Sequence, residues 1–339
     1  MTEPILHGGN LREAARRYAI ALDDWLDLST GINPRGYPVP PVPPDAWRRL
    51  PEDDDGLADC AARYYGAPRA LPVAGSQAAI RALPPLFTRG TVGIAPLAYG
   101  EYAPAFARAG HRVVTLDVAC RALPATLDHI IVGNPNNPTA ERLARETLIE
   151  WHARLTSRGG TLIVDEAFAD VDDDAAHSLA NESARDGLVV LRSVGKFFGL
   201  AGIRAGFVLA APALLDALRD ALGAWTVGGP ARHAVMAAFA DRAWQAETRE
   251  RLQRDGARLA ALLSAHGFDV RATPLFAWTP TPHAPSLQHE LATRGIWTRL
   301  FDRPGMMPSL RFGLPGTEGD WLRLERAMDE IARQRSPIH

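Results

Sequence analysis

The stretch SVGKFFGLAGIRAG, residues 193–206, holds the only lysine of the chain, Lys196. Lysine and arginine together number 37, so all the other residues in that count are arginines. Arginine supplies charge and a rigid fork of donors, whereas a lysine amine can also act as a nucleophile toward a carbonyl. A single lysine among so many arginines suggests that position 196 uses amine chemistry. The alternative is chance retention at a solvated surface.

Polar side chains follow three predicted strands at the point where each strand ends. They are amides, carboxylates, a hydroxyl and the amine: Asn134, Asn136, Asn137, Asp165, Glu166, Ser193 and Lys196. In open parallel sheets, ligands bind beyond the carboxyl ends of the strands, so adjacent strands would bring an amide, a carboxylate and the amine to one crevice. Taken singly, NPNNPT could be only a tight turn and Asp165 only a helix cap.

A phosphate cradle is predicted beside these groups. The small-residue turn AGSQAAI, residues 74–80, opens a predicted helix, whose first N–H groups and dipole suit a phosphate. Ser193 adds a hydroxyl donor, and Arg204 adds a guanidinium that matches phosphate geometry. An amine, a buried carboxylate and a phosphate cradle together indicate a pyridoxal 5'-phosphate (PLP) site. In such a site Lys196 forms the Schiff base and Asp165 pairs with the protonated pyridine nitrogen.

These side chains need a sheet to position them, and the middle of the chain predicts one. Short strand-like runs occupy residues 91–96, 111–118, 128–139, 161–168, 187–196 and 203–210. A helical pattern that ends at Gly66 precedes them, and another, over 141–160, lies between two of them and places Leu148, Trp151 and Leu155 on one face. Short apolar strands separated by helices predict a mostly parallel sheet that is covered on both faces.

The two ends of the chain differ from this middle part. The first 50 residues are predicted to be irregular, with the Pro- and Gly-rich stretch 29–44 forming an ordered crossing segment or lid. Residues 212–265 are mainly helical, and strand-like pieces and a last helix capped by Thr317 follow. We expect an α/β fold with a large domain over 41–235 and a smaller α+β lobe over 236–339. Residues 1–40 would join the small lobe and cover the active site.

Composition excludes several classes of function. The chain has 339 residues, a net charge of −2 and 22% charged residues, which is typical of a soluble globular enzyme. It has no basic stripe for nucleic acid, and no apolar run of the roughly 20 residues that span a membrane. The N-terminus does not resemble a signal peptide. Cys60 and Cys120 form neither a disulfide framework nor a metal-ligand motif, so we expect a cytoplasmic protein without a metal.

Three motifs, NPNNPT, VDEAF and SVGKFFGLAGIRAG, together resemble the fold-type I PLP enzymes of the aspartate aminotransferase superfamily. The resemblance implies a three-layer fold around a seven-stranded, mostly parallel sheet, and a homodimer with active sites at the subunit interface. It implies catalytic roles for Lys196 and Asp165, ring stacking by Tyr99 and a hydrogen bond from Asn137 to the ring hydroxyl. The implied cofactor-binding residues are Gly75, Ser76, Gln77, Tyr99, Asn137, Asp165, Ser193, Lys196 and Arg204.

The N-terminal part narrows the resemblance. HGGNLREAARRY and LDLSTGINPRGYP, together with DEAF, are similar to the threonine-phosphate decarboxylases of cobalamin biosynthesis. This implies decarboxylation of L-threonine O-3-phosphate to (R)-1-amino-2-propanol O-2-phosphate. Arg311 would bind the substrate carboxylate and Arg299 its phosphate. The full implied substrate-binding set is His7, Ser29, Gly31, Asn33, Arg299 and Arg311.

The sequence departs from this family pattern at three places. Phe168 stands where many relatives have Tyr, which removes one donor to the ring hydroxyl. Gly195 precedes the lysine where relatives often have Ser or Thr, which removes a hydroxyl near the phosphate. Asp54 or Asp55 takes the place of a Tyr that relatives offer to the neighbouring subunit's cofactor phosphate. A carboxylate repels a phosphate, which argues against that contact here.

Other functions fit parts of the same pattern. An aminotransferase of the histidinol-phosphate type would use nearly the same motif residues, so these residues do not by themselves choose between decarboxylation and transamination. A non-enzymatic PLP-binding regulator would carry an N-terminal DNA-binding domain, and no such region precedes HGGN. A degenerate scaffold is disfavoured because Lys196, Asp165, Asn137 and Arg204 are all present.

Overall fold

The computed structural model describes residues 8–118, 123–172 and 177–335 and separates into two compact units. The large unit comprises residues 36–137 and 141–249, and the small unit comprises residues 1–35, 138–140 and 250–339. The long helix α9, Arg242–Ala265, contains the boundary at residues 249 and 250. Within the described residues, no helix is both long enough and apolar enough to cross a membrane.

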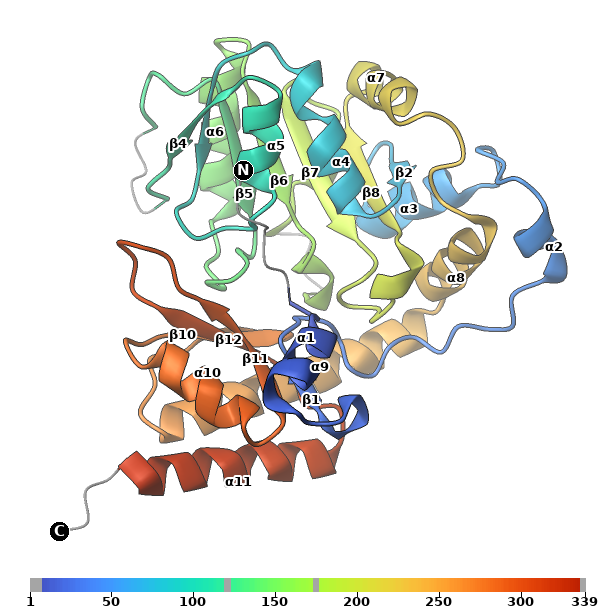
Figure 1. Cartoon of the computed structure of the whole chain (residues 1–339). Helices are drawn as coiled ribbons and strands as arrows, with labels where there is room; N and C mark the ends of the chain where they lie inside the picture. Colours follow the sequence, from blue (N-terminus) through green and yellow to red (C-terminus); the bar gives the residue numbers. More distant parts are fainter. Residues whose placement is uncertain (1–7, 119–122, 173–176, 336–339) are drawn as a thin grey trace. The chain divides into compact units, whose positions relative to one another are not determined.

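The large unit is built on a seven-stranded sheet (Figure 1). In spatial order its strands are β2 (Leu71–Val73), β8 (Gly206–Ala210), β7 (Leu188–Ser193), β6 (Thr161–Asp165), β5 (His129–Gly133), β3 (Thr91–Ile94) and β4 (Arg112–Thr115). All neighbours are parallel except β8, which is antiparallel to both β7 and β2. The prediction of a mostly parallel, seven-stranded sheet is therefore confirmed.

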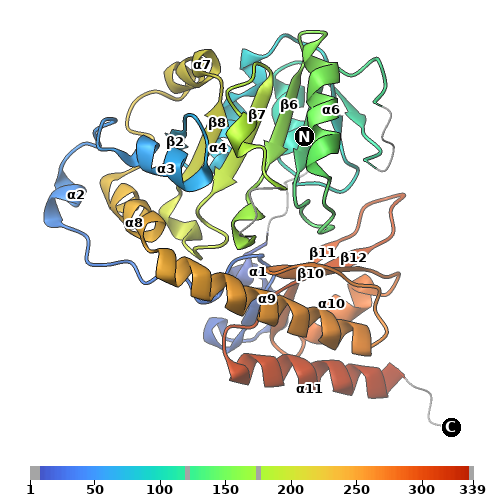
Figure 2. The same ribbon diagram turned by 180° about the vertical axis from the view of Figure 1, so that it is seen from behind.

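Helices cover both faces of this sheet. The helices of the large unit include α2 (Pro44–Arg48), α3 (Leu57–Tyr65), α4 (Ser76–Ala82), α5 (Tyr102–Arg108), α6 (Arg145–Thr156), α7 (Pro212–Leu222) and α8 (Gly229–Ala240). Helix α2 lies at the outer edge and packs against α8. Helices α4 and α5 lie on the face toward the viewer in Figure 1, and α3 and α6 lie on the face toward the viewer in Figure 2. On α6 the predicted apolar face is fully buried at Leu148, Trp151 and Leu155. Gly66 ends α3 in the left-handed conformation (φ +64°), which glycine adopts without steric cost.

The small unit holds a five-stranded sheet and the remaining helices. Its strands, in spatial order, are β1 (Leu26–Leu28), β11 (Ile296–Phe301), β12 (Ser309–Gly313), β10 (Phe276–Pro280) and β9 (Arg271–Thr273). Its helices are α1 (Leu11–Tyr18), α10 (Ala284–Ala292), α11 (Glu318–Arg335) and the later part of α9. Thr317 accepts a hydrogen bond from the Asp320 N–H at 3.2 Å, which confirms the predicted cap of the last helix.

The prediction that the first 50 residues are irregular was wrong in three places, and one of them is the short helix α2 at Pro44–Arg48. Residues 11–18 form α1, which has Glu13 in its first turn and arginines in its last turn, as the helix dipole favours. Residues 26–28 form β1, which pairs in parallel with Ile296–Thr298 of β11. Strand β1 has only three residues, and its partner lies some 270 positions along the chain, so no local pattern reveals it. Residues 29–43 contain no helix or strand, which agrees with the prediction that the stretch 29–44 is irregular up to the residue where α2 begins.

An ion pair in the large unit ties the start of α3 to α8. Arg232 is only 4% exposed and donates from Nε and Nη2 to the two carboxylate oxygens of Asp55, both at 2.6 Å. The Leu57 N–H donates to the same carboxylate at 3.0 Å. Burial acts to raise the pKa of Asp55, but these hydrogen bonds and the Arg232 charge bring it below its ordinary value of 3.8. Asp55 is thus engaged within its own chain.

We expect Asp55→Asn to reduce the free energy of unfolding by about 1–3 kcal/mol near neutral pH, because it leaves the buried Arg232 without a charged partner. Since the folded-state pKa of Asp55 is depressed, its contribution is present above the unfolded-state pKa and is lost as pH falls through the folded value. Urea unfolding should show the wild-type advantage at about pH 7 and about pH 5, and a smaller one near pH 3.

The matched control is Asp45→Asn, because Asp45 pairs with Arg48 and both side chains are 73% exposed. Exposed pairs contribute little, so this variant should unfold like the wild type. Equal losses in the two variants, or a wild-type advantage that grows in acid, would contradict the assignment.

Candidate functional site

A pocket of about 110 Å³ in the large unit opens where β5, β6 and β7 end. These strands are neighbours in the sheet, so their carboxyl ends share one edge. The residues that the sequence nominated for cofactor binding all line it: Gly75, Ser76, Gln77, Tyr99, Asn137, Asp165, Ser193, Lys196 and Arg204. Tyr102, Gly133, Pro135, Ala167 and Phe168 complete the lining.

Three polar residues from the same strand ends do not line this pocket. The side chain of Asn134 exchanges two hydrogen bonds with the backbone of the loop before α6, and Asn136 donates to a backbone oxygen before α5 at 2.8 Å. Glu166 accepts a hydrogen bond from Arg192 instead. Asn134 and Asn136 therefore hold the turn in place, and Asn137 is the asparagine of NPNNPT that lines the pocket.

Asp165 ends β6 as a buried carboxylate, 7% exposed. Its Oδ2 accepts a hydrogen bond from the Tyr102 hydroxyl at 2.8 Å, and its Oδ1 accepts one from the Ala167 N–H at 3.0 Å. Burial raises the pKa of Asp165 above its ordinary value, while Tyr102, Ala167 and the charge of Lys196 act to lower it. A buried carboxylate held in this way is suited to pair with a cationic ring nitrogen.

The loop before α4 is closely packed at two glycines, Gly75 in the loop and Gly206 on β8. Gly75 has φ +76°, and a Cβ at this position would lie 2.8 Å from Nη2 of Arg204. A Cβ on Gly206 of β8 would lie 2.7 Å from the backbone nitrogen of Ser76. Glycine at both positions therefore lets β8 and the Arg204 guanidinium approach the loop. With the first N–H groups of α4 and the Ser193 hydroxyl, the arrangement can hold a phosphate.

Aromatic side chains form another part of the pocket wall. The Tyr99 hydroxyl donates to Oε1 of Gln77 at 2.9 Å, and the Tyr99 ring meets the Tyr102 ring edge-on at 5.5 Å. Burial raises the pKa of Tyr99 to about 12, so Tyr99 stays protonated at neutral pH. The amine nitrogen of Lys196 lies 5.6 Å from the centre of the Phe168 ring. Phe168 thus offers a π face to the amine and no hydroxyl.

Packing gives a reason for Gly195, the second departure from the family pattern. A Cβ at Gly195 would lie 3.0 Å from Cα of Ala201 and 3.3 Å from its Cβ. These distances are tighter than ordinary van der Waals contact, so a Ser or Thr would require the backbone at Ala201 to shift. The loop that carries Lys196 is therefore packed too closely here to add a phosphate-binding hydroxyl.

Tyr102 is the site residue that sequence reasoning missed. It is 2% exposed and contacts the carboxylate of Asp165 directly. It begins α5 and follows Tyr99 by three residues in the sequence PLAYGEY. Residues three apart share one side of a helical turn, so the spacing of the two tyrosines was the available signal.

The residues nominated for substrate binding belong to the small unit, and His7 lies outside the described residues. Arg311 of β12 is 6% exposed and donates from Nη2 to the Ser29 carbonyl oxygen at 2.7 Å. Arg299 of β11 lies opposite Arg311 in the strand register. Burial and the charge of Arg299 lower the pKa of Arg311 to about 9, and burial also lowers the pKa of Arg299. Two neighbouring cations, both partly desolvated, favour an anion beside them.

The turn STGIN uses its side chains within the small unit. The Ser29 hydroxyl donates to Asp27 at 2.6 Å and accepts the Gly9 N–H at 2.8 Å, and Ser29 is fully buried. Gly31 is buried as well, and Asn33 accepts the Arg35 N–H at 3.0 Å. In this structure these three residues shape the turn beside Arg311. Over the described residues, no group of three or more His, Cys, Asp or Glu side chains could hold a metal ion.

Comparison with known proteins agrees with this architecture. The family Aminotransferase class I and II matches residues 51–329. A curated threonine-phosphate decarboxylase from Pseudomonas aeruginosa is 51% identical over 324 residues, covering 95% of this chain and 96% of the relative. Another, from Sinorhizobium, is 41% identical over 341 residues and covers 98% of this chain and 99% of the relative.

Solved structures share the fold. The crystal structure of histidinol-phosphate aminotransferase from Sinorhizobium meliloti in complex with pyridoxal-5'-phosphate matches with a TM-score of 0.81 at 17% identity. The match covers 98% of this chain and 96% of that one. The motifs, the mostly parallel sheet and the match over residues 51–329 lead to one conclusion: the chain belongs to the aminotransferase class I and II family.

Proposed function

We propose that the chain is a cytoplasmic, PLP-dependent threonine-phosphate decarboxylase. It would convert L-threonine O-3-phosphate to (R)-1-amino-2-propanol O-2-phosphate and CO₂, and the product would supply the aminopropanol linker of cobalamin. The observation that carries the proposal is 51% identity to a threonine-phosphate decarboxylase over nearly the whole chain. The pocket residues support the PLP-dependent part of the proposal, because they include an amine, a buried carboxylate and a phosphate cradle.

The pocket fits PLP by the chemistry of its donors. Lys196 is the amine that would hold the aldehyde carbon, and the buried Asp165 would pair with the ring nitrogen. Arg204, Ser193 and the loop at Gly75 would hold the phosphate. Because Gly75 has no side chain, the Arg204 guanidinium can lie against this loop. PLP supplies an electron sink for the electron pair that is left on Cα when CO₂ departs.

The protein's own groups would then orient the substrate and move one proton. Arg311 and Arg299 are the candidate partners of the substrate carboxylate and phosphate, because their proximity favours a bound anion. The amine of Lys196 would return a proton to Cα after CO₂ leaves. Asp165, held by Tyr102, would keep the proton on the ring nitrogen. Orientation of the bond to the carboxylate would select decarboxylation over transamination.

The first prediction of this proposal concerns the reaction itself. Purified protein with PLP and L-threonine O-3-phosphate should release CO₂ and form the amino-propanol phosphate while PLP is retained. In a single turnover, the visible spectrum should therefore return to that of the starting enzyme. Conversion of the cofactor to pyridoxamine phosphate, with amino transfer to a 2-oxo acid and no CO₂, would instead establish the aminotransferase alternative.

Lys196→Arg is the control variant for this assay, since it keeps the positive charge and removes the nucleophilic amine. It should lose CO₂ release and the visible absorbance of covalently held PLP as completely as Lys196→Ala does. If either variant keeps that absorbance, PLP is attached elsewhere and the assigned pocket is wrong.

The second prediction concerns Tyr102. Tyr102→Phe removes a donor that lowers the pKa of Asp165, so that pKa should rise. PLP binding should weaken about tenfold, and the pH at which PLP binding is lost on acidification should become higher. Titration of the PLP-depleted protein with PLP at a series of pH values measures both the dissociation constant and its pH dependence. Tyr18→Phe, at an exposed hydrogen bond to His289, is the matched control and should leave both unchanged. An unchanged acid limb in Tyr102→Phe would contradict the role.

We also propose that the protein is a homodimer. Among the described residues of the large unit, three large apolar side chains are more than half exposed, Trp47 (69%), Leu50 (64%) and Trp225 (57%). They lie in or next to α2 and before α8, and these two helices pack together. Exposed aromatic residues of this kind are typical of protein interfaces.

Light scattering should give a mass of about twice 36.7 kDa. Trp47→Glu should shift the protein toward the monomer because it places a charge in the interface. Leu322→Glu, at a 44% exposed position of α11, is the control and should keep the wild-type mass. A monomeric wild type, or a Trp47→Glu variant with the wild-type mass, would contradict this interface.

A further inference from the structure

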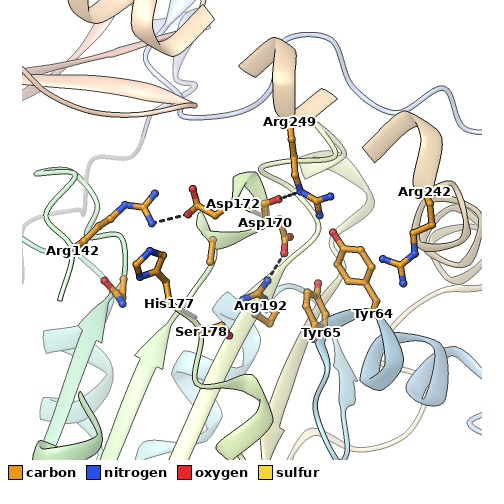
Figure 3. Close-up of a pocket in the computed structure, with 12 residues that line it drawn as sticks. Tyr64, Tyr65, Arg142, Asp170, Asp172, His177, Ser178, Arg192, Arg242 and Arg249 are labelled. Atoms are coloured by element: carbon orange, nitrogen blue, oxygen red, sulfur yellow. Dashed lines mark hydrogen bonds and ion pairs between the residues drawn. The ribbon is translucent and has the colours of Figure 1, made fainter. Parts of the chain in front are cut away.

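A second cavity of the large unit lies on the other side of β7 from the PLP pocket. Successive residues of a strand point to opposite faces of a sheet. Ser193 accordingly lines the PLP pocket, whereas its neighbour Arg192 lines this cavity, which has a volume of about 150 Å³ (Figure 3). Tyr65 and Asp170 border it beside Arg192.

Arg192 makes a fork that joins two carboxylates. Its Nη1 donates to Glu166 at 2.5 Å, and its Nη2 donates to Asp170. All three side chains are buried: Arg192 is 7% exposed, Glu166 is 1% exposed and Asp170 is 2% exposed. The guanidinium also stacks over the ring of Tyr65 at 4.4 Å. A planar guanidinium fits two carboxylates and an aromatic face at once, which an ammonium group cannot do.

The two carboxylates belong to the loop that follows β6. Glu166 comes directly after Asp165, and it is also fixed by the Ser178 hydroxyl at 2.6 Å and the Leu179 N–H at 2.8 Å. Asp170 lies in the short helical turn Ala169–Val171. The fork therefore fastens two points near the start of the loop, four residues apart, to the strand that carries Ser193.

The same loop sets the orientation of Asp165. The Ala167 N–H donates to the Asp165 carboxylate, and the Glu166 N–H donates to the Leu191 carbonyl on β7 at 2.9 Å. Movement of Glu166 would therefore disturb both the Asp165 carboxylate and the pairing of β6 with β7. Asp165 and Lys196 must be placed together for one cofactor, and a shift of about 1 Å in such a group costs a large factor in binding or rate.

We infer that Arg192 is a positioning residue: through Glu166 and Asp170 it holds Asp165 on one strand and the Ser193–Lys196 loop on the next in register for the cofactor. This inference rests on the proposed PLP site and deepens it. Arg192 touches neither the pocket nor its ligand in this arrangement, because it lines the opposite cavity. Its effect on PLP would pass entirely through the loop after β6.

The test uses Arg192→Lys, which keeps the charge without the fork, and Asp170→Asn, which keeps the shape without the second carboxylate. The matched control is Arg142→Lys: Arg142 lines the same cavity and pairs with Asp172 at 2.6 Å, so it contacts the loop after β6 beyond the two carboxylates that Arg192 joins. PLP dissociation constants, the pH midpoint of the bound-PLP absorbance and thermal melting of the PLP-depleted protein are measured for each variant, without substrate.

Arg192→Lys and Asp170→Asn should weaken PLP binding at least about tenfold and shift the pH midpoint, while Arg142→Lys stays within about twofold of the wild type. A merely structural role would lower the melting temperature and leave the pH midpoint unchanged, and that result overturns the inference. If Arg192→Lys does not fold, Asp170→Asn decides the question by the same two readouts.

Failure of the proposed function gives a different result. A wild-type protein that binds PLP and releases no CO₂ overturns the decarboxylase proposal, and the positioning role is still decided by the PLP measurements. A wild-type protein that binds no PLP overturns both.

Discussion

The buried charge of Asp165 is the constraint on which the large unit depends. A carboxylate that is 7% exposed loses most of its hydration, so it remains ionised only if donors and cations replace the water. The chain supplies them from three places: Tyr102 at the start of α5, the Ala167 N–H in the loop after β6, and the charge of Lys196 after β7. Helix α5 follows β3 in the chain, and β3, β5, β6 and β7 are consecutive neighbours in the sheet, so this order brings the three places together.

Because successive residues of a strand point to opposite faces of the sheet, the pocket residues lie on one face and the buried ion pairs lie on the other. On one side, Asp165, Ser193 and Lys196 line the pocket that we propose for PLP. On the other side, the neighbours Glu166 and Arg192 meet in an ion pair that is nearly inaccessible to water. One guanidinium faces two carboxylates there, and burial of such a group is costly unless the geometry is good. The arrangement thus places rigid ion pairs directly behind the residues that need fixed positions.

Much of the large unit could be predicted from the sequence, because its signals are local. Short apolar runs marked each parallel strand, and the polar residues after them marked the pocket edge, since parallel strands end at one edge. Strand β1 could not be predicted, because its three residues are strand only through pairing with β11. Glu166 and Asn134 look like pocket residues in the sequence, yet the pleat and the turn direct them elsewhere. Tyr102 was not predicted because its hydrogen bond to Asp165 depends on α5 beginning at this residue, which the sequence pattern did not show.

Three cations within thirteen residues show why the single lysine matters. Arg192 uses its planar fork to join two buried carboxylates, and Arg204 brings its guanidinium against the Gly75 loop, where a phosphate would lie. Either task suits arginine, because each requires several donors in fixed directions. Lys196 lies between them in sequence, and in the proposed function it supplies one nucleophilic nitrogen near the buried Asp165. An arginine at 196 would also supply charge to Asp165, so the proposed function explains the lysine by its nucleophilic amine, which arginine lacks.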